Sequence, residues 1–329
     1  MLLAGAAAGA AVAINVGYVV QHSGLASAPR IELRRPLAAV AALLRCPRWV
    51  AGAVLGYAGL ALEYIALTAL PLSAVQATIG AGLVIVAVLS RVRGGVALAR
   101  GDVLGAALAI AALAVIAVAT PAAGAAHHAP SPLGLAAAAA VVAGGGALAA
   151  LRLRTAAGLA LAAGLLYGMT SIAMAALAPL LAGASPPLAV AGIALATGVP
   201  ATAAGFVCFQ RALQRGRPLP VVTAMMAGMD VVAIAGGLLV LGDPLASGAG
   251  ARTAQLAGLA LAALSAVVVL HAGRREAPAA EKAPGLERGE DTVLRSRVRR
   301  IGARPGVPAA DDLQVRDGGP SATRAPVEA

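Results

Sequence analysis

Residues 218–242 read PLPVVTAMMAGMDVVAIAGGLLVLG, an apolar run that holds one carboxylic acid, Asp230, near its centre. A helix needs about 20 mostly apolar residues to cross a hydrocarbon core about 30 Å thick. The run meets this length. It therefore predicts a transmembrane helix with an acid about halfway along it.

The composition of the whole chain points the same way. The 329 residues are 60% hydrophobic, 12% charged and 2% aromatic, and the mean hydropathy is +0.87. An average soluble domain is about 45–50% apolar and about 25% charged. The composition therefore excludes a soluble domain and predicts an integral membrane protein.

Eight further runs of this kind occur in the chain. The predicted spans are 2–20, 48–70, 71–90, 102–121, 132–151, 155–183, 186–210, 218–242 and 253–272. We therefore expect an all-α polytopic membrane protein with about nine transmembrane helices in a transmembrane domain over 1–272. Because aromatic residues are scarce, packing is expected to come from small residues, as in Gly164-x-x-x-Gly168. Pro179 and Pro200 are the candidate positions for a kinked or broken span.

The last segment of the chain, 273–329, differs in kind from the rest. It carries eleven Lys or Arg, nine Asp or Glu and six Pro, without apolar periodicity. A segment of this composition cannot bury enough apolar surface to fold. We expect a disordered cytoplasmic tail.

Arginine is concentrated in alternate connections between the predicted spans. The odd-numbered connections hold Arg30, Arg34, Arg35, Arg45, Arg48, Arg91, Arg93, Arg100, Arg152, Arg154, Arg211, Arg215 and Arg217, whereas the even-numbered ones hold Arg252. Cytoplasmic loops retain Lys and Arg, so the N-terminus is expected outside a plasma (inner) membrane and the C-terminus in the cytoplasm. Because the net charge of +11 is spread over loops, no nucleic-acid partner is expected.

Missing motifs exclude several classes of function. Lys282 is the only lysine, so the spans lack a P-loop lysine and this chain alone is not an ATP-driven pump. Cys46 and Cys208 lie far apart, and no zinc-protease or serine-hydrolase motif occurs. His127-His128 has no Cys, Asp or Glu nearby and is interpreted as a loop pair. We expect neither an enzyme nor a cofactor, and the sequence assigns no metal site.

A short internal repeat relates the two halves of the chain. Residues 71–77 read PLSAVQA, residues 218–224 read PLPVVTA, and both open a predicted span. The two spans are five apart in order, which reverses their direction in the membrane. The pattern predicts two inverted four-helix repeats, 1–121 and 155–272, joined by a linking helix, 132–151. Inverted repeats are typical of secondary transporters whose substrate site lies near the midplane.

Short motifs in both halves carry a family resemblance. They are Ala66-Leu67, Pro71-Leu72-Ser73 and Val75 in the first half, and Ala212-Leu213, Val222-Thr223 and Leu241-Gly242-Asp243-Pro244-Leu245 in the second. These segments resemble the drug/metabolite transporter (DMT/EamA-like) superfamily. Nine spans, an outside N-terminus and a basic first loop are most similar to its NIPA-type branch, which is associated with magnesium transport. The first half departs from the family pattern, with Arg91-Val92-Arg93 where an acidic residue is expected.

Polar residues inside the predicted spans are the candidate transport pathway. A carboxylate at the bilayer centre costs about 2.5–3.5 kcal/mol on insertion scales, so Asp230 and Glu63 are expected to bind a cation or carry a coupling proton. A neutral carboxylic acid bonded to a neighbouring helix is the alternative. Gln76, Asn15 and Thr223 are the other candidates. Tyr57, Tyr64, Thr78, Tyr167, Thr170 and Ser171 are interpreted as structural.

The sequence favours a secondary transporter that moves a small solute by alternating access, with a cation or proton as the candidate coupling species. Two alternatives stay open: a NIPA-like magnesium or divalent cation transporter, and a non-transporting membrane assembly or accessory protein. The expected partners are a small-molecule or ion substrate and the lipid bilayer. The sequence does not determine the substrate, the coupling ion or the oligomeric state.

Overall fold

Apolar helices make up the regular structure of the protein. The computed structural model describes residues 2–25, 41–94, 99–119, 130–153, 155–243, 246 and 248–281. Within these residues, eight helices are long and apolar enough to cross a membrane: Pro47–Ala66, Leu72–Val92, Arg100–Ala119, Pro132–Arg152, Ala156–Leu181, Leu188–Arg215, Pro218–Leu239 and Ala249–Ala272. Each coincides with a predicted span to within a few residues, which indicates an integral membrane protein. The remaining predicted span, 2–20, is helical as well.

The helix boundaries follow local sequence signals. In chain order the helices are α1 (Leu2–Leu25), α3 (Pro47–Ala66), α4 (Leu72–Ala81), α5 (Leu83–Gly94), α6 (Arg100–Ala119), α7 (Pro132–Arg152), α8 (Ala156–Leu177), the short η1 (Ala178–Ala182), α9 (Leu188–Arg215), α10 (Pro218–Leu239) and α11 (Ala249–Glu281). Ser131 Oγ accepts the Gly134 N–H at 3.0 Å, and Thr155 Oγ1 accepts the Gly158 N–H at 3.1 Å, so hydroxyl N-caps open α7 and α8.

The last helix continues beyond the predicted end of the transmembrane domain at 272. Residues 273–281 belong to α11. The rest of the predicted tail, 282–329, lies outside the described residues, as do His127-His128 and Pro244-Leu245.

The third predicted span is formed by two helices, α4 and α5, which meet at Gly82. The Gly82 N–H donates to the Ile79 carbonyl at 3.0 Å, which spans three residues instead of the four of an α-helical hydrogen bond. Asn15 Nδ2 of α1 donates to the same carbonyl at 3.1 Å. A side chain at Gly82 would collide with Asn15 Nδ2. The break is therefore held by a neighbouring helix.

The two prolines that are candidates for a kinked or broken span lie in different surroundings. Helix α9 continues through Pro200, whereas Pro179 lies in η1, directly after α8.

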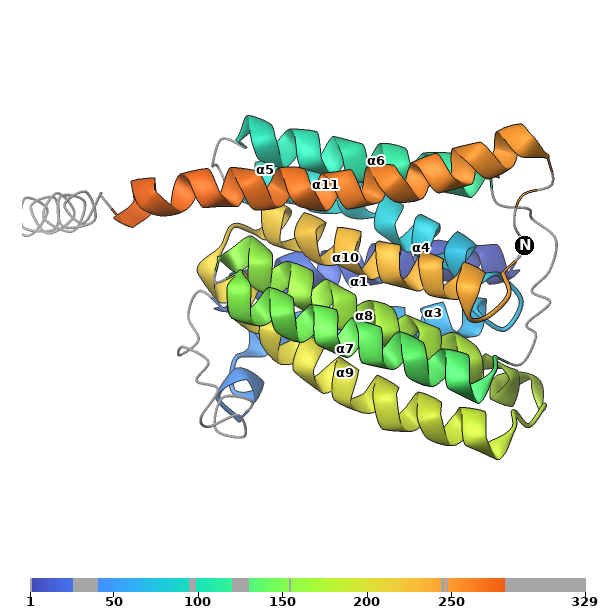
Figure 1. Cartoon of the computed structure of the whole chain (residues 1–329). Coiled ribbons are helices and arrows are strands. Elements are labelled where there is room, and N and C mark those ends of the chain that lie inside the picture. The colour runs from blue at the N-terminus through green and yellow to red at the C-terminus, as the bar shows by residue number, and fades with distance from the viewer. Residues whose placement is uncertain are drawn as a thin grey trace, which may run out of the picture. The chain divides into compact units, whose positions relative to one another are not determined.

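Glycine brings the helices close together. A Cβ at Gly17 of α1 would lie 2.8 Å from the Gly52 carbonyl of α3, and one at Gly164 of α8 would collide with the Met225 carbonyl of α10. The predicted spacing Gly164-x-x-x-Gly168 therefore is a packing surface, because both of its glycines contact α10. The Ser265 hydroxyl of α11 donates to a carbonyl of α6 at 2.8 Å. Figure 1 shows α6 beside α11 on one side of the bundle, and α7 packs on α8 and α9 on the other.

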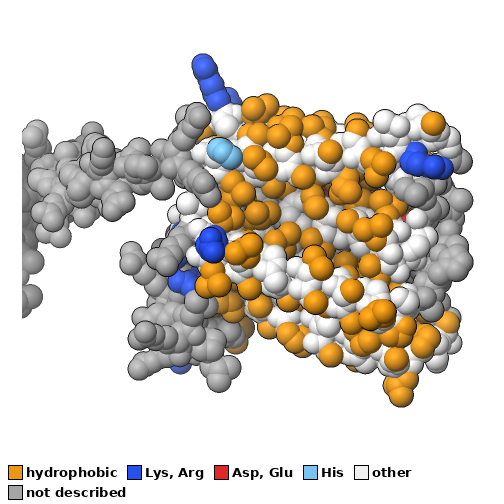
Figure 2. Space-filling view, viewed as in Figure 1, with side chains coloured by type: hydrophobic (Ala, Val, Ile, Leu, Met, Phe, Trp, Pro, Cys, Tyr) orange, Lys and Arg blue, Asp and Glu red, His pale blue; other side chains and the backbone are white. Residues whose placement is uncertain are grey.

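Polar contacts join helix ends on one side of the bundle. Arg217, just before α10, forms an ion pair of 2.8 Å with Asp102 at the start of α6, and His22 Nε2 of α1 lies 3.2 Å from the Gly216 carbonyl. Residues that border the first, third and seventh connections, which the charge pattern assigns to one side, thus lie together at one end. Figure 2 shows the middle of the visible face covered by apolar side chains, with Lys and Arg side chains near its ends. This distribution suits a helical bundle in lipid.

Candidate functional site

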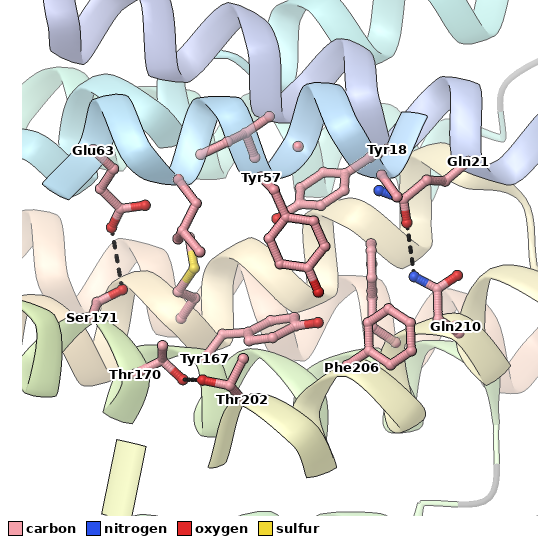
Figure 3. A pocket seen from close by; sticks show the side chains of 16 residues that line it. Tyr18, Gln21, Tyr57, Glu63, Tyr167, Thr170, Ser171, Thr202, Phe206 and Gln210 are labelled. Carbon is pink, nitrogen blue, oxygen red and sulfur yellow. Dashed lines mark hydrogen bonds between the residues drawn. The ribbon is translucent and has the colours of Figure 1, made fainter. Parts of the chain in front are cut away.

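A cavity of about 100 Å³ lies among α1, α3, α8 and α9, with Met229 of α10 in its wall (Figure 3). The other lining residues are Ile14, Tyr18 and Gln21 on α1; Ala53, Gly56, Tyr57, Leu60 and Glu63 on α3; Tyr167, Thr170 and Ser171 on α8; and Thr202, Phe206, Phe209 and Gln210 on α9. On each helix they recur mainly at spacings of three and four residues. Such residues share a helix face, so each helix presents a single face to the cavity.

Aromatic side chains form much of the cavity wall. The whole chain has four Tyr and two Phe, and the cavity is lined by three of these Tyr and both Phe: Tyr18, Tyr57, Tyr167, Phe206 and Phe209. The Tyr18 and Phe209 ring centroids are 4.9 Å apart, and those of Tyr167 and Phe209 are 6.2 Å apart, both edge to face. This is the geometry that aromatic rings prefer. A chain that is poor in aromatic residues has therefore gathered most of them around one cavity.

Glu63 provides the charge of the site. It is the one Asp, Glu, Lys, Arg or His among the described residues that line the cavity, and it is 3% exposed. Its Oε1 accepts hydrogen bonds from Gln76 Nε2 at 2.7 Å and from Ser171 Oγ at 3.4 Å. Within the part of the chain that the structure describes, no donor reaches Oε2. One carboxyl oxygen is thus left for a ligand in the cavity.

The opposite end of the cavity is polar but neutral. Trp49 Nε1 donates to Gln210 Oε1 at 3.0 Å, Gln210 Nε2 donates to Gln21 Oε1 at 2.8 Å, and Gln21 Nε2 donates to the Gly52 carbonyl at 3.3 Å. The two amide side chains thereby bind each other and their neighbours. Figure 3 shows Glu63 and Gln210 at opposite ends of the aromatic group. The site therefore has one acidic end and one neutral end.

A second group of polar side chains lies around α4, outside the cavity lining. Asn15 and Asp230 are both buried against residues 79–82: Asn15 binds the Ile79 carbonyl, and a Cβ at Gly80 would lie 2.9 Å from Asp230 Oδ2. Among the described residues no partner reaches three buried oxygens of this group, Asn15 Oδ1, Gln76 Oε1 and Asp230 Oδ1, or the buried hydroxyls of Thr223 and Ser90 elsewhere. Buried polar atoms of this kind are uncommon and call for an explanation.

The five candidate residues from the sequence occupy three places. Glu63 lines the cavity, and Gln76 binds it from α4. Asn15 and Asp230 lie one helical turn further along α4, against Ile79 and Gly80. Thr223 is separate, since it lies seven residues before Asp230, which is about 10 Å along the axis of α10. The structure thus gathers four candidates around α4 and leaves Thr223 apart.

Sequence reasoning missed the aromatic wall. The sequence pattern indicates a structural role for four residues that line the cavity, namely Tyr57, Tyr167, Thr170 and Ser171. Thr170 Oγ1 also lies 2.9 Å from Thr202 Oγ1, which joins α8 to α9 within the wall. The signal that could have found them is their spacing, because Tyr167, Thr170 and Ser171 fall on one helix face, as do Phe206, Phe209 and Gln210.

The chain was also compared with known proteins. It matches no protein-family model, and no similar sequence is found among curated proteins and no similar fold among solved structures.

Proposed function

We propose that the chain is a secondary transporter of the drug/metabolite type, which moves a small solute by alternating access around the Glu63 cavity. One observation carries the proposal. The cavity is lined by α1 and α3, from the first predicted repeat, and by α8 and α9, from the second, and it holds a buried carboxyl group. Transporters built from inverted repeats place their substrate site between the repeats near the midplane.

Pairwise contacts support the inverted repeat. The first two helices of each predicted repeat pack on each other, α1 on α3 and α8 on α9. Helices α4 and α10 carry the two copies of the sequence repeat. At the N-terminal end of each lies an acidic residue from the other predicted repeat. Asp243 Oδ2 accepts the Ser73 N–H at 3.0 Å at the start of α4, and Asp102 pairs with Arg217 at the start of α10. Asp102 thus is an acidic counterpart of Asp243 in the first half of the chain, where the family motif lacks its acidic residue.

Cation or proton coupling is assigned to Asp230 together with Glu63. The two buried acids approach α4 one helical turn apart, Glu63 at Gln76 and Asp230 at Gly80. Neighbouring carboxylates repel each other when both are ionised, and a proton or a cation relieves this repulsion. Among the described residues no Arg or Lys side chain forms an ion pair with either group. A coupling species that enters and leaves can therefore bias the two helix bundles between their conformations.

Solute uptake into proteoliposomes tests the proposal. Purified protein is screened against cationic, neutral and anionic small solutes, with imposed proton or sodium gradients. We expect uptake that exceeds the protein-free liposome control and falls at least about tenfold in Glu63→Gln. Ser265→Ala is the control variant, because it removes a buried hydrogen bond between α6 and α11 without touching the cavity. Equal uptake by wild type and Glu63→Gln would remove the cavity from the mechanism.

Divalent cation transport is the second candidate. The unpartnered buried oxygens of Asn15, Gln76 and Asp230 around α4 are hard ligands of the type that Mg²⁺ prefers, although the described residues contain no group of three His, Cys, Asp or Glu that could hold a metal. Magnesium-dependent uptake in the same liposomes, with no organic solute, would favour this candidate. A protein that moves none of these solutes would fit a non-transporting assembly or accessory role.

A further inference from the structure

We propose that the Glu63 cavity selects a small organic cation of the quaternary ammonium type, with one positive charge and no negative charge. This substrate class rests on the proposed transport function. The inference combines three features of the cavity: a lone carboxyl group, an aromatic wall, and a neutral far end.

The carboxyl group sets the sign of the ligand's charge. Glu63 has no cationic neighbour among the described lining residues, and its two hydrogen bonds both use Oε1. An acid inside the membrane is stabilised by pairing, and here the ligand has to bring the partner charge. An anion would meet the carboxyl oxygen Oε2 without any basic residue to compensate, so the cavity disfavours anions.

The aromatic wall sets the chemical type of the cation. Aromatic rings attract cations through their electron-rich faces, and proteins use this attraction to recognise quaternary ammonium ligands, which have no N–H group to donate. Tyr57 lies on the open side of the cavity, since it is 57% exposed, whereas Phe209 is buried in the wall. Figure 3 shows the side chains of Tyr18, Tyr57 and Tyr167 grouped together, with Glu63 at one end of the group. A methylated ammonium group fits this combination of rings and one acid.

The far end excludes a second charge. Gln21 and Gln210 bind each other, Trp49 and a backbone carbonyl, and because both amides are neutral they offer no positive charge that could pair with a carboxylate. A zwitterion such as an amino acid would therefore leave its carboxylate unpaired in the membrane. The volume of about 100 Å³ is also far below the roughly 300–1,000 Å³ of drug-sized sites, so the ligand is small.

Equilibrium dialysis of radiolabelled choline against the full-length protein in detergent tests the proposal without requiring transport. Fluorescence of Trp49, the only tryptophan, gives a second readout, because the ring centroids of Trp49 and of Phe206 in the cavity wall are 6.1 Å apart. We expect saturable binding of choline, competition by tetramethylammonium, and little competition by glycine betaine. The neutral analogue of choline, in which carbon replaces the nitrogen, should also compete poorly.

Variants assign the binding to the cavity. The dissociation constant should rise at least about tenfold in Glu63→Gln and about threefold to tenfold in Tyr57→Leu, whereas Tyr57→Phe keeps the ring and should bind as wild type does. Tyr64→Leu is the matched control on α3, because Tyr64 lies outside the cavity and donates to the Leu177 carbonyl. Size-exclusion chromatography verifies that each variant is folded.

The outcomes separate this inference from the proposed transport function. Equal binding of choline and its neutral analogue, unchanged affinity in Glu63→Gln, or no choline binding to folded wild type would each overturn the inference. In the last case, Glu63-dependent uptake of another solute would leave the transport proposal standing. Choline binding without any uptake would have the opposite meaning, since the ligand class would stand and transport would fail.

Discussion

At the scale of single residues, the main feature is that acids inside the membrane differ in their surroundings. Glu63 faces a cavity and receives two hydrogen bonds, whereas Asp230 is buried between α10 and α4 with Oδ1 unpartnered among the described residues. In the proposed mechanism Glu63 would meet the solute in the cavity, and Asp230 would contribute to coupling from outside the cavity lining. The two roles are separable because the groups lie on different helices.

Asp230→Asn tests the coupling role. The amide keeps the size of the side chain and cannot be ionised, so uptake driven by an ion or proton gradient should fall at least about tenfold, while exchange of solute at equilibrium persists. Both rates are measured in proteoliposomes. Thr223→Val is the control two turns away on α10 and should behave as wild type does. Gradient-driven uptake that survives in Asp230→Asn would exclude this residue from coupling.

At the scale of helices, close approach of backbones replaces large interlocking side chains. Gly164, Gly168 and Gly228 all lie between α8 and α10, where an added Cβ would meet the facing helix. Dispersion between closely packed backbones stabilises helices in lipid, where the hydrophobic effect cannot. The same helices position the cavity lining, so this packing and the site depend on each other.

A pair of glycine substitutions tests this packing. Gly164→Ala should lower stability by about 1–3 kcal/mol, because its methyl group would collide with the Met225 carbonyl. Gly144→Ala on the exposed face of α7 meets nothing within 4 Å and should be neutral or stabilise by up to about 1 kcal/mol. Thermal unfolding in detergent measures both. If close backbone packing stabilises the bundle, the unfolding midpoint should fall in Gly164→Ala and not in Gly144→Ala. Equal midpoints for the two variants would contradict this explanation.

The N-terminus of α4 provides a second test at this scale. Asp243 Oδ2 accepts both the Ser73 N–H and the Ser73 hydroxyl, at 3.0 and 2.9 Å, and the α4 N-cap residue Pro71 supplies no side-chain bond. Asp243→Ala should therefore cost about 1–2 kcal/mol of stability, the range for loss of a cap.

The control for this variant is Thr253→Ala, since the exposed Thr253 hydroxyl binds only a carbonyl of its own helix among the contacts of the described residues. It should shift the unfolding midpoint in detergent by little. An Asp243→Ala midpoint that matches the control would show that the cap does not stabilise α4.

At the scale of the whole molecule, the charge pattern and the contacts agree. The Arg217–Asp102 ion pair and the His22–Gly216 contact bring together connections that are predicted to lie on the cytoplasmic side. Alternating access requires the two predicted repeats to move against each other, and the cavity lies where helices from both repeats meet.

Reporter fusions test the orientation. A reporter that is active only outside should be active at the N-terminus and silent at the C-terminus, and a cytoplasmic reporter should give the reverse. Fusions at the exposed Gly248, in the connection just before α11, should behave as the N-terminus does. Both chain ends in one compartment would contradict the odd number of spans and the inverted repeat.

The sequence by itself determined the helical class, the positions of the eight described membrane-length helices, and the presence of two acids, Glu63 and Asp230, inside such helices. These properties are local, since a helix in lipid satisfies its backbone hydrogen bonds within one segment and its length follows from bilayer thickness. The tertiary structure alone decided that α4 breaks from α5 at Gly82, that Asp243 caps α4, and that three tyrosines and both phenylalanines surround one acid. Those features depend on which helix faces meet, and the spacing within one helix cannot specify the face of another.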